Sequence, residues 1–236
     1  SDGEDDDDDD DRVLADDDDG GDDGNYDEAI AFMKQQVEKH GWLHIQDTAW
    51  EGYEAIPLDI MRGYTTMAKE ALEQLRKAHS VPTHVFLQAG VGSMAAAVTA
   101  YMVDYYQKQG WKLPKFIIVE PTVANCLYET AKARDGKRHI VGGAMASMMA
   151  GLCCGEPCTL AWDILDSYAD GFLEMEDGVD AEGMRRLAQP LGDDPAIVSG
   201  ESGAAGFSAA LAILTRDDLS DVKNKLGLDK EAVIFC

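Results

Sequence analysis

The segment whose residue types most clearly suggest a binding function is Gly90-Val91-Gly92-Ser93, a glycine turn between a predicted strand and a predicted helix. The free backbone N–H groups and the positive dipole end of a helix N-terminus attract anions. The two glycines allow close approach of the backbone to an anion, and the Ser93 hydroxyl adds a donor. The pattern therefore predicts phosphate binding, with tight strand–helix packing as the alternative.

The same turn also fits a dinucleotide fingerprint, G-x-G-x-x-A, over Gly90–Ala95. In such a site, an acidic residue at the end of the next strand binds a ribose. Glu120 occupies that place, 28 residues after Gly92, which is somewhat far along the chain. A dinucleotide-binding domain is therefore a minor alternative.

Asp47 is the second candidate group. It follows a short predicted strand, Leu43–Gln46, and opens a segment rich in polar and aromatic residues, Asp47–Tyr53. A carboxylate held there could remove a proton from a bound substrate. It could equally cap the segment that follows, and the residues alone do not decide between these roles.

Alternating elements must position these groups. Apolar periodicity predicts helices over 26–40, 56–77, 94–107, 124–133, 160–169, 178–187 and 199–214, and strands over 43–46, 84–88, 116–119, 172–176 and 232–235. This alternation predicts an α/β fold with a mainly parallel sheet between two layers of helices. Ligands of such sheets bind at the carboxyl ends of strands, where we expect the loops 46–50, 88–93 and 120–121.

The charge of the chain is concentrated at its N-terminus. The formal net charge is −25, and residues 1–28 hold 17 acids and one base, which leaves −9 for the remainder. Residues 1–25 are predicted to be a disordered acidic tail, with calcium or a basic partner as alternative uses, and 26–236 a partial α/β domain. The acidity argues against nucleic acid and an anionic membrane surface as partners. No window has the roughly 18 apolar residues that membrane insertion needs, so a cytoplasmic or other soluble intracellular location is expected.

The five cysteines predict neither a metal centre nor a disulfide framework. Cys153, Cys154 and Cys158 lie close together, but the nearest histidine is His139 and no second cysteine pair follows. From the residues alone, Cys126 and Cys154 are expected to be buried free thiols, unless the fold brings them together.

Taken together, several segments resemble diaminopropionate ammonia-lyase, a fold-type-II pyridoxal-phosphate enzyme related to the tryptophan synthase β-chain. They occur in the family's order and cover roughly residues 25–236. The matching segments are Asn25–Asp27, Gln46–Tyr53, Pro82–Ala95, Ile118–Pro121, Met149–Leu152, Cys154–Pro157 and Ser199–Ala204.

The resemblance implies that pyridoxal 5'-phosphate is the cofactor and that 2,3-diaminopropionate, a small amino acid, is eliminated to pyruvate and ammonia. It places the cofactor phosphate on Gly90, Val91, Gly92 and Ser93, and Glu201 near the cofactor ring. Asp47 becomes a substrate-facing carboxylate or the base.

The resemblance also gives roles to residues whose type and spacing alone suggest no function. It puts Tyr26 and Thr48 at the substrate entrance, and it makes Cys126 and Cys154 a possible disulfide near that entrance. The family is dimeric, so a homodimer, or a partner chain that covers the incomplete fold, is expected.

Two parts of the family pattern have no match in these residues. The lysine motif that attaches the cofactor precedes everything matched here, and so does the Gly-Asn-His-like turn. Covalent attachment through a recognised lysine of this chain is therefore not expected, and the chain alone is predicted to be inactive. Two interpretations follow: a piece of an active lyase, or a non-catalytic structural or interaction subunit derived from one.

Overall fold

The computed structural model describes residues 26–236, with side chains from residue 31. The predicted acidic tail, 1–25, lies outside the described residues. Eight α-helices and four strands are present within the described part: α1 (Tyr26–His40), α2 (Ala55–Lys77), β1 (His84–Gln88), α3 (Ser93–Gln109), β2 (Lys115–Pro121), α4 (Cys126–Ala133), α5 (Thr159–Tyr168), β3 (Ala169–Met175), α6 (Asp177–Ala188), α7 (Glu201–Thr215), α8 (Ser220–Leu226) and β4 (Ile234–Phe235). Two short 3-10 turns, Ala150–Leu152 and Asp217–Leu219, complete the list.

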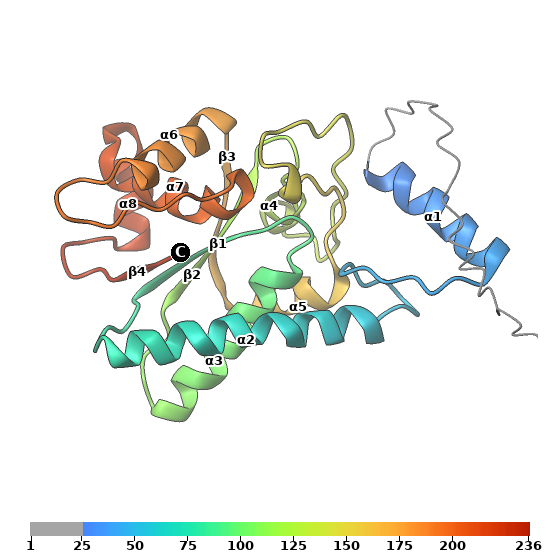
Figure 1. Ribbon diagram of the computed structural model, residues 1–236, viewed down its shortest axis with the longest axis horizontal. Coiled ribbons are helices and arrows are strands. Elements are labelled where there is room, and N and C mark those ends of the chain that lie inside the picture. Colours follow the sequence, from blue (N-terminus) through green and yellow to red (C-terminus); the bar gives the residue numbers. More distant parts are fainter. Residues whose placement is uncertain (1–25) are drawn as a thin grey trace, which may run out of the picture.

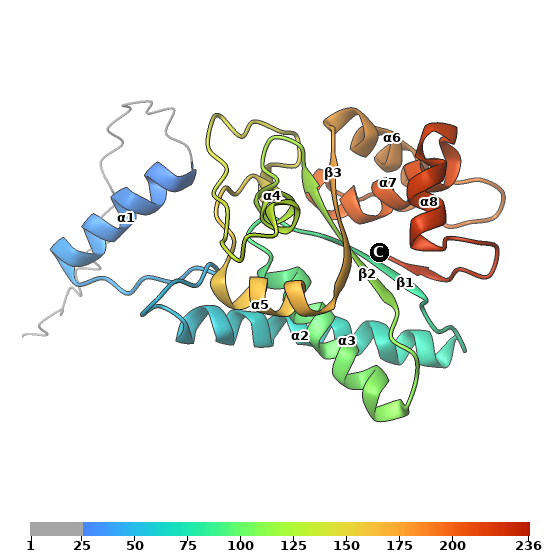
Figure 2. The ribbon, with the colours of Figure 1, turned by 180° about the vertical axis from the view of Figure 1, so that it is seen from behind.

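The four strands form one parallel sheet in the order β3-β2-β1-β4. Because parallel neighbours need a crossover, β1, β2 and β3 are each followed by helical structure that returns along a face of the sheet. In Figure 1, α2, α3 and α5 lie on one side of the sheet and α6, α7 and α8 on the other. The rear view in Figure 2 shows the same two layers. The predicted three-layer fold is confirmed.

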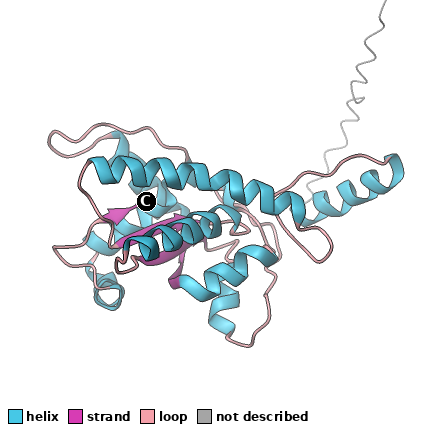
Figure 3. Ribbon diagram, turned by 90° about the horizontal axis from the view of Figure 1, so that it is seen from below, coloured by secondary structure: helices cyan, strands magenta, loops and turns pink. Residues whose placement is uncertain are grey.

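The central strands are apolar on both faces, as a sheet covered twice requires. Val85 and Leu87 of β1 pack into the core beneath α2, α3 and α5, whereas Phe86 faces the core built with α7. The view from below in Figure 3 shows the strands enclosed between helices. This double coverage explains why β1 and β2 are continuous apolar segments in the sequence.

The strand predicted over Leu43–Gln46 is wrong. Residues 41–46 have no regular structure, and Leu43 and Ile45 are 76% and 65% exposed. The Tyr53 hydroxyl donates to the His44 carbonyl and accepts from the Gln46 N–H, both at 3.0 Å. These backbone groups are thus paired by one side chain, and no neighbouring strand is needed.

The other predicted elements are present, with shifted ends. The helix α8, by contrast, was not predicted: it is only seven residues long and carries few apolar side chains. No helix within residues 26–236 has the length and apolar character needed to cross a membrane.

Close packing of α7 on β1 depends on Gly206. A Cβ at this position would lie 2.8 Å from the Phe86 carbonyl oxygen, which is fixed in the sheet. We expect Gly206→Ala to lower the free energy of unfolding by about 1–3 kcal/mol, because helix and strand must separate. Urea unfolding measures this change.

Gly178→Ala is the matched control, because no atom lies within 4 Å of a Cβ at that helical glycine. It should leave stability unchanged or raise it by up to about 1 kcal/mol. Equal destabilisation by both substitutions would contradict this account of α7 packing.

Candidate functional site

The loop between β1 and α3 forms the floor of a cavity of about 250 Å³. Gly92 is the residue before the first turn of α3 and has φ +97°, a conformation that side chains other than glycine rarely adopt. A Cβ there would lie 3.2 Å from the side chains of Leu127 and Leu165. The loop is therefore held against α4 and α5, with the open N-terminus of α3 facing the cavity.

The predicted phosphate residues are brought together. Gly90, Val91, Gly92 and Ser93 all line this cavity. The Ser93 side chain, however, is 2% exposed and donates its hydroxyl proton to the Asp47 carbonyl oxygen at 2.7 Å. The anion donors that remain at this end of α3 are backbone N–H groups.

Asp47 lines the same cavity, although no strand precedes it. Burial raises the pKa of its carboxyl group, while hydrogen bonds from its own backbone and from Thr48 act in the opposite direction. Thr48, predicted at the substrate entrance, is 6% exposed and does not line the cavity. A carboxyl group with a raised pKa beside an anion site is suited to exchange protons with a ligand.

A stack of aromatic rings holds the segment that carries Asp47. Trp50 and Tyr53 stack at 4.5 Å and are joined by two backbone hydrogen bonds, and His44 stacks on Tyr53 at 4.7 Å. The Lys34 ammonium lies 4.0 Å from the centre of the Trp50 ring, which adds a cation–π contact. The stack fixes the turn that follows Asp47.

Cys158 connects this segment to Gly90–Ser93, which is called the phosphate loop below for its predicted role. Its N–H donates to the Val91 carbonyl at 2.9 Å, and its Sγ accepts the Ala49 N–H at 3.3 Å. The next residue, Thr159, donates to the Ala49 carbonyl through both its backbone and its hydroxyl. The first turn of α5 therefore sets the spacing between the two loops.

Neither Cys126 nor Cys154 forms a disulfide in the structure, and both lie beside Gly90. The Cys126 Sγ donates to the Gly90 carbonyl at 3.8 Å, and the Cys154 Sγ lies 3.1 Å from where a Gly90 Cβ would be. Burial, reinforced by Glu120 and Cys154, raises the pKa of the Cys126 thiol. Their pairing as a disulfide stays a prediction.

The remaining predicted site residues are Glu201 and Tyr26. Glu201 is exposed at the start of α7, whereas its neighbours Ser202 and Gly203 line the cavity. Tyr26 is the first residue of α1, and its side chain lies outside the part that the structure describes. The roles assigned to Glu201 and Tyr26 stay predictions.

Sequence reasoning missed Tyr64, which reaches the cavity from α2. Burial and the nearby Asp47 carboxylate both raise the pKa of its phenol. It lies on the helix face that also buries Met61 and Ala68, so the three- and four-residue spacing was an available signal. Ser202 was also missed; its Oγ accepts the Gly151 N–H at 3.1 Å.

Glu120 cannot serve as a ribose-binding acid. Its side chain is 0% exposed, and its two oxygens accept the N–H groups of Leu127 and Tyr128 at 2.9 and 2.7 Å. It holds the start of α4. This geometry removes the acidic residue on which the dinucleotide interpretation depended. Among residues 26–236, no group of three or more His, Cys, Asp or Glu side chains is placed to hold a metal.

Comparison with known proteins decides the family. A family model described as pyridoxal-phosphate dependent enzyme matches residues 12–225. The chain belongs to this family. Its fold, with a glycine loop that can hold a phosphate at the start of α3, fits the phosphate group of the family's cofactor.

Individual relatives narrow the resemblance. Diaminopropionate ammonia-lyase of Escherichia coli K12 is 48% identical over 213 residues, and that of Salmonella typhimurium LT2 is 45% identical over 215. These matches cover 90% of this chain and 52% of each relative, so the chain spans about half the length of the curated relatives it matches.

Comparison with solved structures shows the same similarity. The holo Escherichia coli lyase superposes with a TM-score of 0.81 at 45% identity, over 89% of this chain and 51% of that one. The processed form of threonine deaminase isoform 2 of Solanum lycopersicum has the same fold at 18% identity, with a TM-score of 0.66 over 89% of this chain and 52% of that one.

Glu120 makes stability depend on pH. Burial raises the pKa of its carboxyl group from the ordinary 4.5 to about 8, against the opposing bonds from Leu127 and Tyr128. Its contribution is fully present below pH 4.5 and is lost as the pH rises through 8, because only the unfolded chain ionises freely in that window. We expect Glu120→Gln to flatten the decline in unfolding free energy between pH 5 and 8.

Chemical denaturation at several pH values measures this slope. Glu70→Gln, on the exposed face of α2, is the control and should keep the native slope. An unchanged slope in Glu120→Gln would show that other groups cause the pH dependence.

Hydrogen exchange tests the bridge that Cys158 forms between the Ala49 segment and the phosphate loop. Cys158→Ala leaves the buried Ala49 N–H without its acceptor, which costs about 1–3 kcal/mol. We expect faster hydrogen exchange at the Ala49 amide, measured by NMR, with most of the protection restored in Cys158→Ser. Cys153→Ala, which removes a long 3.6 Å bond to Met149, should leave the Ala49 amide protected. Unchanged exchange in Cys158→Ala would exclude the bridge.

Proposed function

We propose that this chain forms the phosphate-binding and substrate-facing part of a pyridoxal-phosphate dependent lyase that eliminates ammonia from 2,3-diaminopropionate. The observation that carries the proposal is one cavity lined by the glycine loop Gly90–Ser93 and by Asp47. The match to diaminopropionate ammonia-lyases, at 48% identity over 90% of this chain, supports this choice of substrate.

Pyridoxal phosphate, when bound, supplies an electron sink for the carbanion formed at the substrate α-carbon. The residues of this chain have three tasks around it. The backbone N–H groups at the start of α3 hold the phosphate, and Ser93 fixes the Asp47 segment through its hydrogen bond to the Asp47 carbonyl. Asp47 exchanges a proton with the substrate, or orients its amino groups.

The raised pKa of Asp47 supports the acid–base role. A carboxyl group that holds its proton more tightly than usual is a better base, and it can return the proton to a leaving amine. The net reaction consumes one water and converts one 2,3-diaminopropionate into one pyruvate and two ammonia molecules. Each nitrogen of the substrate leaves as ammonia, so the atoms balance.

Partner chains belong to the same proposal. We infer that another segment, in the same protein or in a second chain, completes the site with the lysine that attaches the cofactor. The exposed apolar side chains Phe32, Trp42, Leu43 and Ile45 support this inference, since such a group is typical of a surface covered by another part of an assembly.

A second candidate function is that of a non-catalytic relative of these lyases that serves in interactions with other proteins. The exposed apolar side chains Phe32, Trp42, Leu43 and Ile45 would serve such interactions as well. The two functions differ in turnover, while both keep the cofactor phosphate site.

Turnover and cofactor binding separate these possibilities. The native protein, supplied with pyridoxal phosphate, should convert 2,3-diaminopropionate to pyruvate, which lactate dehydrogenase and NADH report. Asp47→Asn should lower kcat by about 100-fold or more, because it removes the proton-exchanging group. Glu51→Gln, an exposed neighbour, should keep the native rate.

Gly92→Ala should weaken the binding of pyridoxal phosphate by about tenfold or more, because its Cβ would contact Leu127 and Leu165 and displace the loop. Absorbance titration measures the affinity. Folded native protein that binds the cofactor but forms no pyruvate would establish the non-catalytic function. Unaltered binding in Gly92→Ala would contradict the phosphate site itself.

A further inference from the structure

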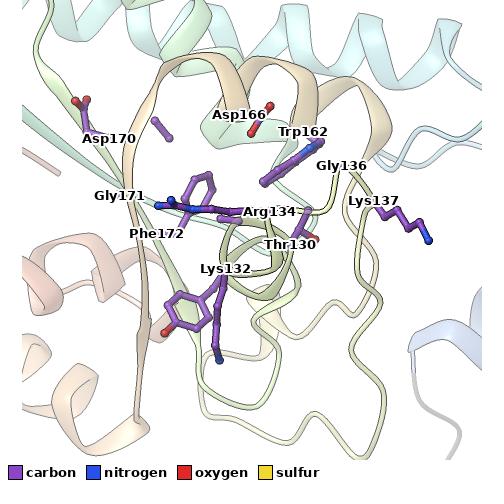
Figure 4. A pocket seen from close by; sticks show the side chains of 13 residues that line it. Thr130, Lys132, Arg134, Gly136, Lys137, Trp162, Asp166, Asp170, Gly171 and Phe172 are labelled. Atoms are coloured by element: carbon purple, nitrogen blue, oxygen red, sulfur yellow. The ribbon is translucent and has the colours of Figure 1, made fainter.

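A second cavity, of about 800 Å³, lies between the C-terminal half of α4, the outer face of α5 and the beginning of β3 (Figure 4). It has no lining residue in common with the cavity at the phosphate loop. Neither the proposed lyase chemistry nor the comparisons give it a role. Its lining combines aromatic side chains with charges of both signs.

The aromatic wall is formed by Trp162 of α5 and Phe172 of β3. Their ring centroids are 5.7 Å apart, and both side chains are half-buried, so part of each ring faces the cavity. Packing against the core below α5 holds both rings in place. Such a fixed apolar wall favours a flat apolar group of a ligand.

Three cations line the cavity, Lys132, Arg134 and Lys137, and the Lys137 side chain extends away from the aromatic pair in Figure 4. Arg134 ends α4 in the left-handed conformation, with φ 50°, and its side chain extends past Phe172 on the side of the cavity opposite Asp166 in Figure 4. Within the part of the chain that the structure describes, its guanidinium has neither a hydrogen-bond nor an ion-pair partner. The neighbouring Lys132, in contrast, is paired with Glu129 at 2.9 Å.

The acidic groups of the lining limit which anions fit. Asp170 already accepts the Phe116 N–H at 3.0 Å, and Asp166 is exposed on the rim. The charged side chains of the lining are Lys132, Arg134 and Lys137 against Asp166 and Asp170, so one more positive than negative charge is present and a monoanion balances it better than a dianion such as a phosphate. A single carboxylate matches the planar guanidinium, which can donate two parallel hydrogen bonds to it.

We propose that this cavity binds a small aromatic carboxylate, with the carboxylate on Arg134 and the ring against Trp162 and Phe172. The ligand class follows from a guanidinium that has no partner among the described residues and lies beside a fixed aromatic wall. The chain as a whole has 45 acidic and 20 basic residues, so an anion finds few other places to bind.

Isothermal titration of the native protein with 3-phenylpropionate tests the proposal. Three matched probes remove one feature each: propionate lacks the ring, 2-phenylethylamine carries a positive charge, and phenyl phosphate carries a second negative charge. We expect measurable binding of 3-phenylpropionate and affinities at least about tenfold weaker for each of the other three. Equal binding of 2-phenylethylamine or of phenyl phosphate would overturn the proposal, as would no binding of 3-phenylpropionate.

Variants locate the binding. Arg134→Gln should weaken the binding of 3-phenylpropionate by about tenfold or more, because it loses a hydrogen-bonded ion pair. Arg138→Gln is the matched control, since Arg138 follows on the same loop without lining the cavity, and it should bind as the native chain does. Trp162→Leu should also bind more weakly, with thermal unfolding used to verify that it remains folded.

Gly92→Ala distinguishes this cavity from the phosphate loop. It should leave the affinity for 3-phenylpropionate unchanged while weakening that for pyridoxal phosphate. Loss of 3-phenylpropionate binding in Gly92→Ala but not in Arg134→Gln would place the ligand at the phosphate loop and overturn the proposal.

Discussion

The site depends on how closely α4 and α5 approach the loop that follows β1. Gly92 adopts φ +97°, and a Cβ there would lie 3.2 Å from the side chains of Leu127 and Leu165, so the loop is packed tightly against both helices. Cys158, the residue that precedes α5, donates its N–H to the Val91 carbonyl and accepts the Ala49 N–H. One packing arrangement thereby fixes the phosphate loop and the Asp47 segment relative to each other, although 43 residues separate Asp47 from Gly90 along the chain.

Two carboxyl groups with raised pKa values perform different tasks because their surroundings differ. Glu120 is fully buried, and its oxygens hold the first N–H groups of α4, so its role is to start that helix. Asp47 is only half-buried and faces a cavity, so the same desolvation leaves it able to exchange a proton with a ligand. Exposure to the cavity, and not the pKa shift, separates the functional carboxyl group from the structural one.

The sequence predicted the sheet and the glycine loop between β1 and α3 because both depend on local patterns. Continuous apolar residues marked β1 and β2, and the glycine spacing marked the start of α3. Contacts between distant segments had no such signal: the Tyr53 hydroxyl that replaces a strand at 44–46, the hydroxyl of Ser93 turned to Asp47, and the thiol bridge of Cys158. Glu120 was misassigned in the dinucleotide alternative for the same reason, since its burial depends on α4 folding over it.

The proposed phosphate site would be formed by this chain's own backbone. Its donors would be N–H groups at the start of a 17-residue helix, and its shape comes from glycines packed against side chains of the same 211 described residues. Neither feature requires a lysine to be in place, because a phosphate binds through charge and hydrogen bonds and not through the aldehyde. Cofactor binding and turnover are therefore separable in this family fold, and a chain of this kind could keep the first whether or not it takes part in the second.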